Sequence, residues 1–587
     1  NYFFEPMKRN ASVKPMIPDE NYSVLSPIFA EYYVKALDSI GSFYYTKESF
    51  DETYPGYGSS YPDVQGAVAI LFEQASSRGH LQETNYGTMS FGFTIRNQYL
   101  SSIATVEAAV DNKDLLRDYQ MRFFNSSITE FNNEKVKAYE FGDMYDQNRN
   151  KAFIDKLLLH KIKVYNSKGK FVVPVNQPQS RMVKNFFETH SKYIDSVFYD
   201  ASAWSVSNVY NMKSKELKSF FGESEIKSTE DFVKNLKPKK SNYAYIIDWD
   251  DYNSPAALNH LQKNGIITYS AFKPFTIKVN GTNSSKKFNY GSVLIPVSKQ
   301  KISSEKLFDI INEIQNKYEV PIYNSESGYS MKGIDLGSNN FRINKPVKVA
   351  LLIGEGVNSY EAGEVWHLLD TRIGMALTKI KLNQFKDISI DKYTTLVMVS
   401  SEYDNLLKKD INKIKKWVSK GNTLITIGTS SSWAISNNLV KESLVEPERD
   451  STINRKRYID ASEFIGREKI GGSILRVDLD LTHPLAFGYN DKKIPVYKNN
   501  NVFIKKSKNE YSSVAVYSKK FHIDGYISEI NKRDYIPGSA SLIVSEIDDG
   551  RVILFADNPN FRGTWYGTNK LFLNAIFLGD NVSVPTD

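Results

Sequence analysis

The sequence predicts an α/β protein of several domains, and three observations support this fold class. The chain has 587 residues, which at about 100–200 residues per domain corresponds to about three to five domains. Its hydrophobic content is 41% and its charged content 24%, as in ordinary globular proteins. From Pro346 onward, short apolar runs alternate with amphipathic segments, which is typical of parallel strands joined by helices.

Residues 1–125 are predicted to form the first domain. An amphipathic helix is expected over 26–40. A loop rich in Tyr, Gly and Pro over 54–63 then leads into the apolar run 67–72, whose length and composition favour a buried strand. A long helix over 97–123 is expected to end this segment.

Residues 126–240 are predicted to form a β-rich linking domain, and residues 241–345 a small α/β domain. The elements expected in them are strands over 169–174 and 243–248 and helices over 180–189, 255–263 and 304–317.

Residues 346–587 are predicted to form a doubly wound domain with a parallel sheet. The elements expected there are strands over 347–353, 394–399, 423–427 and 551–556 and helices over 360–370, 410–419 and 571–577.

Charge, cysteine content and hydropathy exclude several kinds of partner and site. The formal net charge is only +8 over the whole chain and is not concentrated in a basic block, so we expect no nucleic-acid partner. The chain contains no cysteine, which excludes disulfides, thiolate metal ligands and a cysteine nucleophile. No apolar run approaches the about 20 residues of a spanning helix, so we expect no transmembrane segment.

Glu73 is the strongest candidate for chemistry. It directly follows the strand predicted over 67–72. A carboxylate at the end of a buried strand is partly desolvated, which raises its pKa and suits general acid–base catalysis. The alternative is a strand-end salt bridge between Glu73 and Arg78.

The stretch from Tyr54 to Gln98 resembles the carboxypeptidase A-like zinc metallopeptidases, in particular their large bacterial multidomain branch. The resemblance is carried by Tyr54-Pro-Gly-Tyr-Gly-Ser-Ser-Tyr61-Pro-Asp, by the run ending in Phe72-Glu73, and by Phe93-Thr-Ile-Arg-Asn-Gln98. It implies that residues 1–125 are the C-terminal part of a mixed-sheet catalytic domain. Because the chain opens with Asn1, we expect it to be a piece of a longer polypeptide.

The resemblance also implies roles for individual residues. Glu73 would be the general base that takes a proton from a zinc-bound water. Tyr61, with Tyr57 as second choice, would cover the C-terminal residue of a peptide substrate, the alternative being an exposed loop tyrosine. Arg78 is a candidate for binding the substrate carboxylate.

The family's zinc ligands, a His-x-x-Glu pair and a later His, all precede the segment that corresponds to Asn1. His80-Leu-Gln-Glu83 has this spacing but follows Glu73, so we interpret it as a loop without a metal. We therefore expect zinc in a longer parent protein, no zinc ligands in this chain, and no activity of this chain alone. A secreted or periplasmic location follows from the same resemblance.

Residues 346–587 resemble class I glutamine amidotransferase-like domains, which have a flavodoxin-like arrangement. The turn Gly428-Thr-Ser430-Ser-Ser432 stands where that family has Gly-x-Cys-x-Gly. With Ser430 at the nucleophile position and no downstream His-x-Glu, we expect no glutaminase activity and a domain kept for packing or binding. A serine hydrolase using Ser430 with His483 or His522 is the remaining catalytic alternative.

Two further segments of this domain are candidates for ligand binding. Gly354-Glu-Gly356-Val-Asn-Ser359 resembles a dinucleotide fingerprint but lacks the third glycine, so nucleotide binding is not expected. The loop 557–567 combines aromatic residues with Arg562 after a predicted strand. Ligands of doubly wound sheets bind at the carboxyl ends of strands, so this loop is a candidate for a polar ligand or a partner domain, with structural packing as the alternative.

Two functional hypotheses follow. In the first, the parent protein is a zinc carboxypeptidase acting on peptide or cell-wall amide bonds, with Glu73 as general base. In the second, the chain is a non-catalytic protein that binds a peptide, a glycan or a partner subunit. They differ in whether the native polypeptide carries a His-x-x-Glu pair and a third histidine before Asn1.

Overall fold

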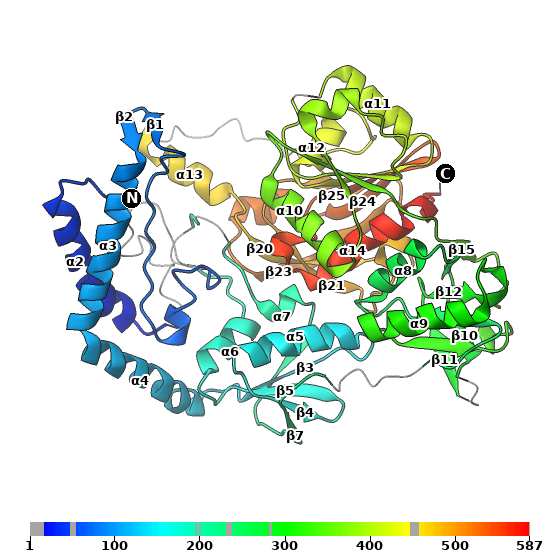
Figure 1. The fold of residues 1–587 in the computed structure, drawn as a ribbon, viewed down its shortest axis with the longest axis horizontal. Coiled ribbons are helices and arrows are strands. Elements are labelled where there is room, and N and C mark those ends of the chain that lie inside the picture. Colours follow the sequence, from blue (N-terminus) through cyan, green and yellow to red (C-terminus); the bar gives the residue numbers. More distant parts are fainter. Residues whose placement is uncertain are drawn as a thin grey trace.

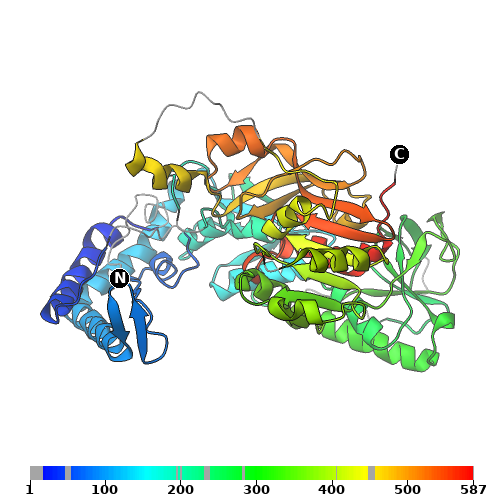
Figure 2. The ribbon, with the colours of Figure 1, turned by 90° about the horizontal axis from the view of Figure 1, so that it is seen from above.

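The computed structural model describes residues 17–46, 54–193, 196–198, 201–230, 238–280, 284–404, 406–446 and 457–585. Within these ranges the protein is a mixed α/β structure with five sheets. The N-terminal helices project at one end of the molecule, and the larger sheets make up the rest (Figures 1 and 2). None of the described helices combines the length and hydropathy required to cross a membrane.

The N-terminal region is helical. Its elements are α2 (Ser26–Ser39), α3 (Phe91–Asp111), α4 (Lys113–Thr129) and a hairpin of β1 (Leu81–Thr84) with β2 (Gly87–Ser90). Helix α2 packs on α3 through buried residues of both helices, namely Phe29, Tyr33, Leu37, Ala104 and Ala108. The single helix predicted over 97–123 is two helices, because Asn112 leaves the α region with φ −109° and ψ 21°.

The strand predicted over 67–72 is wrong, and with it the mixed sheet expected in residues 1–125. The run is extended chain packed on α2 and α3, with Ile70 and Phe72 half-buried. The Phe72 ring meets the Tyr33 ring edge to face at 5.1 Å. Within the described part of residues 1–125, the hairpin β1–β2 is the one sheet. Apolar composition suits a strand, but a sheet also needs neighbouring strands to hydrogen-bond.

The next sheet is antiparallel, with strand order β6-β3-β5-β4-β7. Its strands are β3 (Ala138–Phe141), β4 (Val164–Ser167), β5 (Lys170–Pro174), β6 (Ser214–Leu217) and β7 (Ser224–Ile226), accompanied by helices α5 (Gln147–Leu159), α6 (Ser180–Phe187) and α7 (Val206–Val209). Helix α5 was not predicted. Its start is fixed by Asp146, whose side chain accepts a hydrogen bond from the Arg149 N–H at 3.0 Å, as expected of an Asp N-cap.

Two antiparallel sheets follow, with orders β13-β8-β12-β9-β15 and β11-β10-β14. The strands are β8 (Ala244–Ile247), β9 (Tyr269–Ala271), β10 (Phe275–Lys278), β11 (Ser285–Phe288), β12 (Val293–Pro296), β13 (Ile322–Ser325), β14 (Lys332–Gly333) and β15 (Phe341–Ile343). The helices predicted here both form, as α8 (Ser254–Lys263) and α9 (Ser304–Tyr318).

The largest sheet has ten strands in the order β17-β16-β18-β19-β25-β24-β23-β20-β21, with β22 paired to β24. The strands are β16 (Val349–Ile353), β17 (Thr378–Lys381), β18 (Thr395–Met398), β19 (Thr423–Ile427), β20 (Ser473–Leu479), β21 (Lys493–Lys498), β22 (Ile504–Lys505), β23 (Ser513–Asp524), β24 (Ser539–Ile547) and β25 (Gly550–Phe555). The helices are α10 (Ser359–His367), α11 (Lys408–Val418), α12 (Thr429–Ser436), α13 (Ala461–Glu468) and α14 (Tyr566–Leu578).

The strand pairing in this sheet indicates where a ligand-binding crevice is expected. From β17 to β25 the strands are parallel, and from β25 to β21 they are antiparallel, an extension that the sequence pattern did not predict. Strand β16 comes before both of its neighbours, β17 and β18, in the sequence. The chain therefore adds β17 on one side of β16 and the later strands on the other side, and the strand order reverses at this point. In parallel α/β sheets the carboxyl ends of the strands at such a point form a ligand crevice.

Candidate ligand-binding site

The loop that follows β25 separates two hollows. One is a pocket of about 210 Å³, which we call the aromatic pocket, and the other a cleft of about 1010 Å³, which we call the polar crevice. Phe561 and Arg562 line both hollows. The sequence had marked this loop as a candidate because it follows a strand and combines aromatic residues with an arginine.

Eight aromatic side chains line the aromatic pocket. They come from the loop before the run 67–72, from the region of α6 and α7, and from the large sheet, and they are Tyr54, Tyr61, Phe186, Trp204, Tyr210, Tyr497, Phe561 and Trp565. The Tyr497 ring stacks on Phe561 at 4.0 Å and lies 5.2 Å from the Trp565 ring. A pocket of this kind favours flat or apolar groups of a ligand.

The charged groups of the aromatic pocket are cationic. Lys156, the titratable His160 and Arg562 belong to its lining, and no acidic residue is among the lining residues that the structure describes. The Arg562 guanidinium lies over the Tyr54 ring, 4.3 Å from its centre, where a cation–π contact holds it. The pocket therefore complements an apolar group that carries a negative charge.

Tyr61 is the predicted site residue that the structure places in a pocket. Its side chain is 40% exposed, lines the aromatic pocket, and meets the His160 ring edge to face at 5.8 Å. Tyr57, the second choice, lines the polar crevice. Both tyrosines are positioned by the turns of residues 54–62 rather than by a sheet.

Glu73 and Arg78 lie apart from these hollows. Both are exposed and neither lines the aromatic pocket or the polar crevice. Within the described chain neither forms a salt bridge, so the alternative Glu73–Arg78 pair is not formed. Because the run 67–72 is not a buried strand, Glu73 lacks the desolvated strand-end position that the sequence suggested. The catalytic role of Glu73 and the substrate-binding roles of Tyr61 and Arg78 remain predictions.

Two buried glutamates of α10 shape the polar crevice. Glu364 accepts hydrogen bonds from the Arg562 N–H at 2.5 Å and from Asn558 Nδ2 at 2.7 Å, and burial raises its pKa to about 7. Glu361 accepts the Ser400 N–H at 2.8 Å, and burial raises its pKa as well. Both carboxylates thus tie α10 to neighbouring strand ends, and sequence reasoning did not identify them.

The prediction that Ser430 occupies the nucleophile position is wrong. The strained residue between β19 and α12 is Gly428, with φ 62° and ψ −127°, and a Cβ there would lie 2.3 Å from Ser400 Oγ. Ser430 lies inside α12 instead. It is fully buried, and its Oγ donates to the Met398 carbonyl at 2.6 Å. The turn therefore does not present the Ser430 hydroxyl to the crevice.

The histidines considered earlier have other roles. His483 is buried, and its Nδ1 accepts the Leu485 N–H at 3.1 Å. His522 Nε2 lies 2.7 Å from the Gly525 carbonyl oxygen. Within the described ranges, no group of three or more His, Asp or Glu side chains is arranged to hold a metal ion. Zinc in a longer parent protein stays a prediction.

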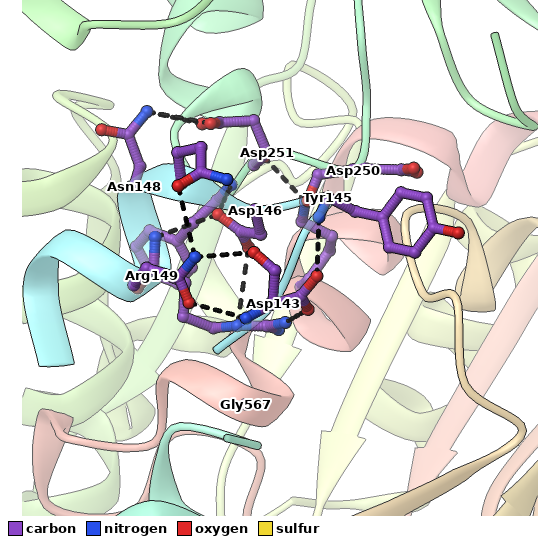
Figure 3. Close-up of polar contacts among 12 residues, drawn as sticks. Asp143, Tyr145, Asp146, Asn148, Arg149, Asp250, Asp251 and Gly567 are labelled. Atoms are coloured by element: carbon purple, nitrogen blue, oxygen red, sulfur yellow. Dashed lines mark hydrogen bonds and ion pairs between the residues drawn. The ribbon is translucent and has the colours of Figure 1, made fainter. Parts of the chain in front are cut away.

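A network of buried charges joins the β-rich, small α/β and C-terminal regions (Figure 3). Asn148 Nδ2 donates to both carboxylate oxygens of Asp251 at 2.9 Å. Asp146 accepts the Tyr252 N–H at 3.0 Å, and Arg149 pairs with Asp143. Burial raises the pKa of Asp251 to about 7.

The C-terminal helix enters the same network. Lys570 Nζ donates to the main-chain carbonyls of Trp249, Asp250 and Asp251 at 2.6, 2.9 and 2.7 Å. Asp250 accepts Asn490 Nδ2 at 3.1 Å, and burial raises its pKa to about 6. Because these groups bond to one another across three regions, we interpret the network as a structural junction. A cleft of about 560 Å³ lies against it.

Comparison with known proteins gives weak matches. No protein-family model and no curated protein matches the chain. A β-galactosidase from Bacillus circulans sp. alkalophilus is 14% identical, with 38% of this chain and 30% of that chain covered and a TM-score of 0.23. A glutamine amidotransferase from Thermotoga maritima is 11% identical, covering 36% and 76%, with a TM-score of 0.24. An exo-β-1,4-mannosidase from Opitutaceae bacterium strain TAV5 is 12% identical, covering 41% and 37%, with a TM-score of 0.22.

These comparisons overturn the carboxypeptidase resemblance. The matched structures are glycosidases and an amidotransferase, and none of those reported is a carboxypeptidase. Among the described residues, the expected mixed sheet around the run 67–72 does not form either. This chain covers less than a third of the length of the β-galactosidase from Bacillus circulans. TM-scores this low do not assign a fold or an activity to the chain, and its fold is described by its own elements.

Proposed function

We propose that the chain is a non-catalytic binding protein whose aromatic pocket holds the carboxyl-terminal residue of a peptide. The observation that carries this proposal is the lining of the pocket, in which eight aromatic side chains surround a space and the charged groups of the described lining residues are cationic. A terminal residue with an aromatic or aliphatic side chain supplies an apolar group and a carboxylate on the same ligand. Arg562 is the cation best positioned for that carboxylate, because Tyr54 supports its guanidinium.

Binding is favoured over hydrolysis by the groups near this loop. The strained turn carries Gly428, which has no side chain, and Ser430 is buried. Lys156 and Arg562, two of the basic groups of the described lining, suit the binding of an anion better than the removal of a proton.

The proposal has an architectural part. We infer a flavodoxin-like arrangement for residues 346–587, supported by the order of the parallel strands β17-β16-β18-β19-β25. In chain order this is 2-1-3-4-5. The loop that carries Arg562 follows the last of these strands, which is where such sheets bind ligands.

Calorimetric titration with N-acetyl-phenylalanine tests the function. We expect saturable binding of the free acid and binding of the corresponding amide weaker by about tenfold, because the amide lacks the charge that Arg562 recognises. Arg562→Gln should remove this preference for the acid. Arg467→Gln is the matched control, since Arg467 lies 4.3 Å above the Phe464 ring, outside the pocket, and it should change nothing.

Equal binding of acid and amide would contradict the proposal, as would the absence of binding to both. Displacement of the acid by a neutral oligosaccharide from the same pocket would replace the peptide with a glycan as the ligand. A secreted or periplasmic location stays a prediction.

A further inference from the structure

The polar crevice lies at the carboxyl ends of the parallel strands, where strand order reverses. The segment after β16 contributes Asn358 and the start of α10, and the segment after β25 contributes Asn558 and Phe561. Asn499, directly after β21, also lines the crevice. Residues from several strand ends therefore converge on one open space, which is the usual position of a ligand in sheets of this kind.

One lining atom lacks a partner. Asn499 Oδ1 is buried, and within the described chain no donor reaches it. Buried acceptors are nearly always hydrogen-bonded, because leaving one unpaired costs the free energy of its lost hydration. A ligand that donates a hydrogen bond at this position would satisfy Asn499.

A potential donor lies in the same crevice. Asn358 Oδ1 accepts the N–H groups of Tyr360 at 3.0 Å and Glu361 at 3.2 Å, which caps helix α10. This leaves the Nδ2 group of Asn358 as the donor of that side chain. The crevice thus combines an amide donor with an unpaired amide acceptor. Hydroxyl groups both donate and accept, and they match this combination.

The charges of the crevice favour a neutral ligand. The lining has titratable or charged groups of both signs, because the carboxyl groups of Glu361 and Glu364 lie in the same crevice as His367 and Arg562, so no excess of positive charge favours a phosphate or another anion. The same carboxylates already accept N–H groups, and Arg562 adds a positive charge to the wall, so a cation gains little. The remaining lining includes the aromatic rings of Tyr57, Tyr360 and Phe561, which offer flat apolar surfaces.

We propose that the polar crevice is a second binding site of this chain, for a neutral polyhydroxylated ligand of the sugar class. The sugar hydroxyls would pair with Asn499 Oδ1 and Asn358 Nδ2, and the apolar C–H face of the ring would lie on an aromatic side chain of the wall. This site is independent of the peptide proposed for the aromatic pocket, although Phe561 and Arg562 line both hollows.

The test is titration of the chain with a panel of neutral disaccharides and oligosaccharides, followed by nuclear magnetic resonance and calorimetry. We expect saturable binding of at least one sugar, weakened about tenfold or more in Asn499→Ala. Because Asn499 Oδ1 has no partner within the described chain, this variant should keep the melting temperature of the parent chain. If Asn499 had a purely structural role, the substitution would lower the melting temperature. Asn242→Ala, an exposed site on the small α/β region, is the matched control and should bind like the parent chain.

Three results would overturn the inference. The first is no saturable binding of any sugar in the panel, and the second is binding that Asn499→Ala leaves unchanged. The third is preferential binding of inorganic phosphate or adenosine monophosphate in the crevice, which would make it an anion site. Tyr61→Ala separates the two proposals, because Tyr61 lines only the aromatic pocket of the two hollows. This variant should weaken the binding of N-acetyl-phenylalanine and leave sugar binding unchanged.

Discussion

The predicted strands 67–72 and 423–427 are similar in length but differ in structure, and 423–427 contains two threonines where 67–72 is wholly apolar. Residues 423–427 form β19, which pairs with β18 on one side and β25 on the other, and all five residues are buried. Residues 67–72 are half-buried extended chain beside two helices. The difference shows that an apolar run specifies burial, whereas a strand also requires neighbours that accept and donate its backbone hydrogen bonds.

At two backbone groups of the run 67–72, side chains take the place of a neighbouring strand. Asp63 Oδ1 accepts the Ala69 N–H at 2.9 Å, and Asn21 Nδ2 donates to the Ala67 carbonyl at 2.8 Å. In β19 the corresponding groups bond to β18 and β25.

The same contrast holds for helices. Every residue of α14 from Gly567 to Leu578 is buried, whereas α3 exposes large apolar side chains such as Val106, at 59%.

Truncating one isoleucine in each run should give the largest difference. Ile425→Ala should lower the free energy of unfolding by about 3–4 kcal/mol, because it opens a cavity in a closely packed sheet. Ile70→Ala should cost about 1 kcal/mol, because Ile70 is only half-buried and its surroundings can relax. Urea denaturation of both variants measures the difference. Equal losses would show that 67–72 is packed as tightly as the sheet.

Asp63, which bonds to the run 67–72, and Asp251, in the buried junction, should make stability depend on pH in the same direction. Burial raises the pKa of Asp63 and of Asp251 to about 7 each, above the ordinary Asp value near 4 in the unfolded chain. The folded state therefore holds protons that the unfolded state releases, so stability falls as pH rises from about 4 to about 7. We expect each of the two groups to contribute a loss of about 2–3 kcal/mol between pH 5 and pH 8.

Asp63→Asn and Asp251→Asn should each flatten this pH dependence, because Asn does not titrate. Denaturation midpoints at a series of pH values measure the slope. A slope that neither variant changes would contradict both shifts.

The exposed face of α3 should tolerate charge. Val106→Lys is expected to change the free energy of unfolding by less than about 0.5 kcal/mol, because Val106 lies largely in solvent. It should also reduce self-association, since it breaks up an exposed apolar stripe. Sedimentation velocity and thermal melting measure the two effects. Ala104→Lys is the matched control on the buried face and should unfold this region.

Glu73→Gln should have the smallest effect. Glu73 is exposed, and within the described chain it forms no salt bridge. We expect a change in the free energy of unfolding of less than about 0.5 kcal/mol and no effect on N-acetyl-phenylalanine binding. A larger loss of stability would show that the carboxylate has a structural partner.

The spacing of apolar residues along the chain predicted several individual helices and strands correctly. The helix predicted over 255–263 is α8, and the one predicted over 304–317 is α9, both with apolar residues at helical spacing. Strand β19 has the bounds that its apolar run gave. The antiparallel half of the large sheet was missed, because residues 473–547 alternate less regularly and their pairing involves register shifts.

The candidate site was predicted only in part. Tyr61 was singled out through the carboxypeptidase resemblance, which the comparisons overturned, and Arg562 because it lies on a loop after a predicted strand. The structure brings both residues to one pocket. Glu361, Glu364 and Asn499 were missed, because Glu and Asn on a helix or after a strand carry no local signal of burial. The junction around Asp251 was missed for the same reason, although the pair Asp250-Asp251 directly after Trp249 marks an unusual concentration of charge.

By itself the sequence determined the α/β class, most helices of the last two regions, and the apolar character of the runs 67–72 and 423–427. These depend on composition and on spacing along the chain, which are local. Only the tertiary structure decided which run became a strand, that Gly428 rather than Ser430 occupies the strained turn, and which residues converge on the two hollows. These depend on hydrogen-bond partners and packing neighbours distant in sequence, and a single sequence does not encode them in any local pattern.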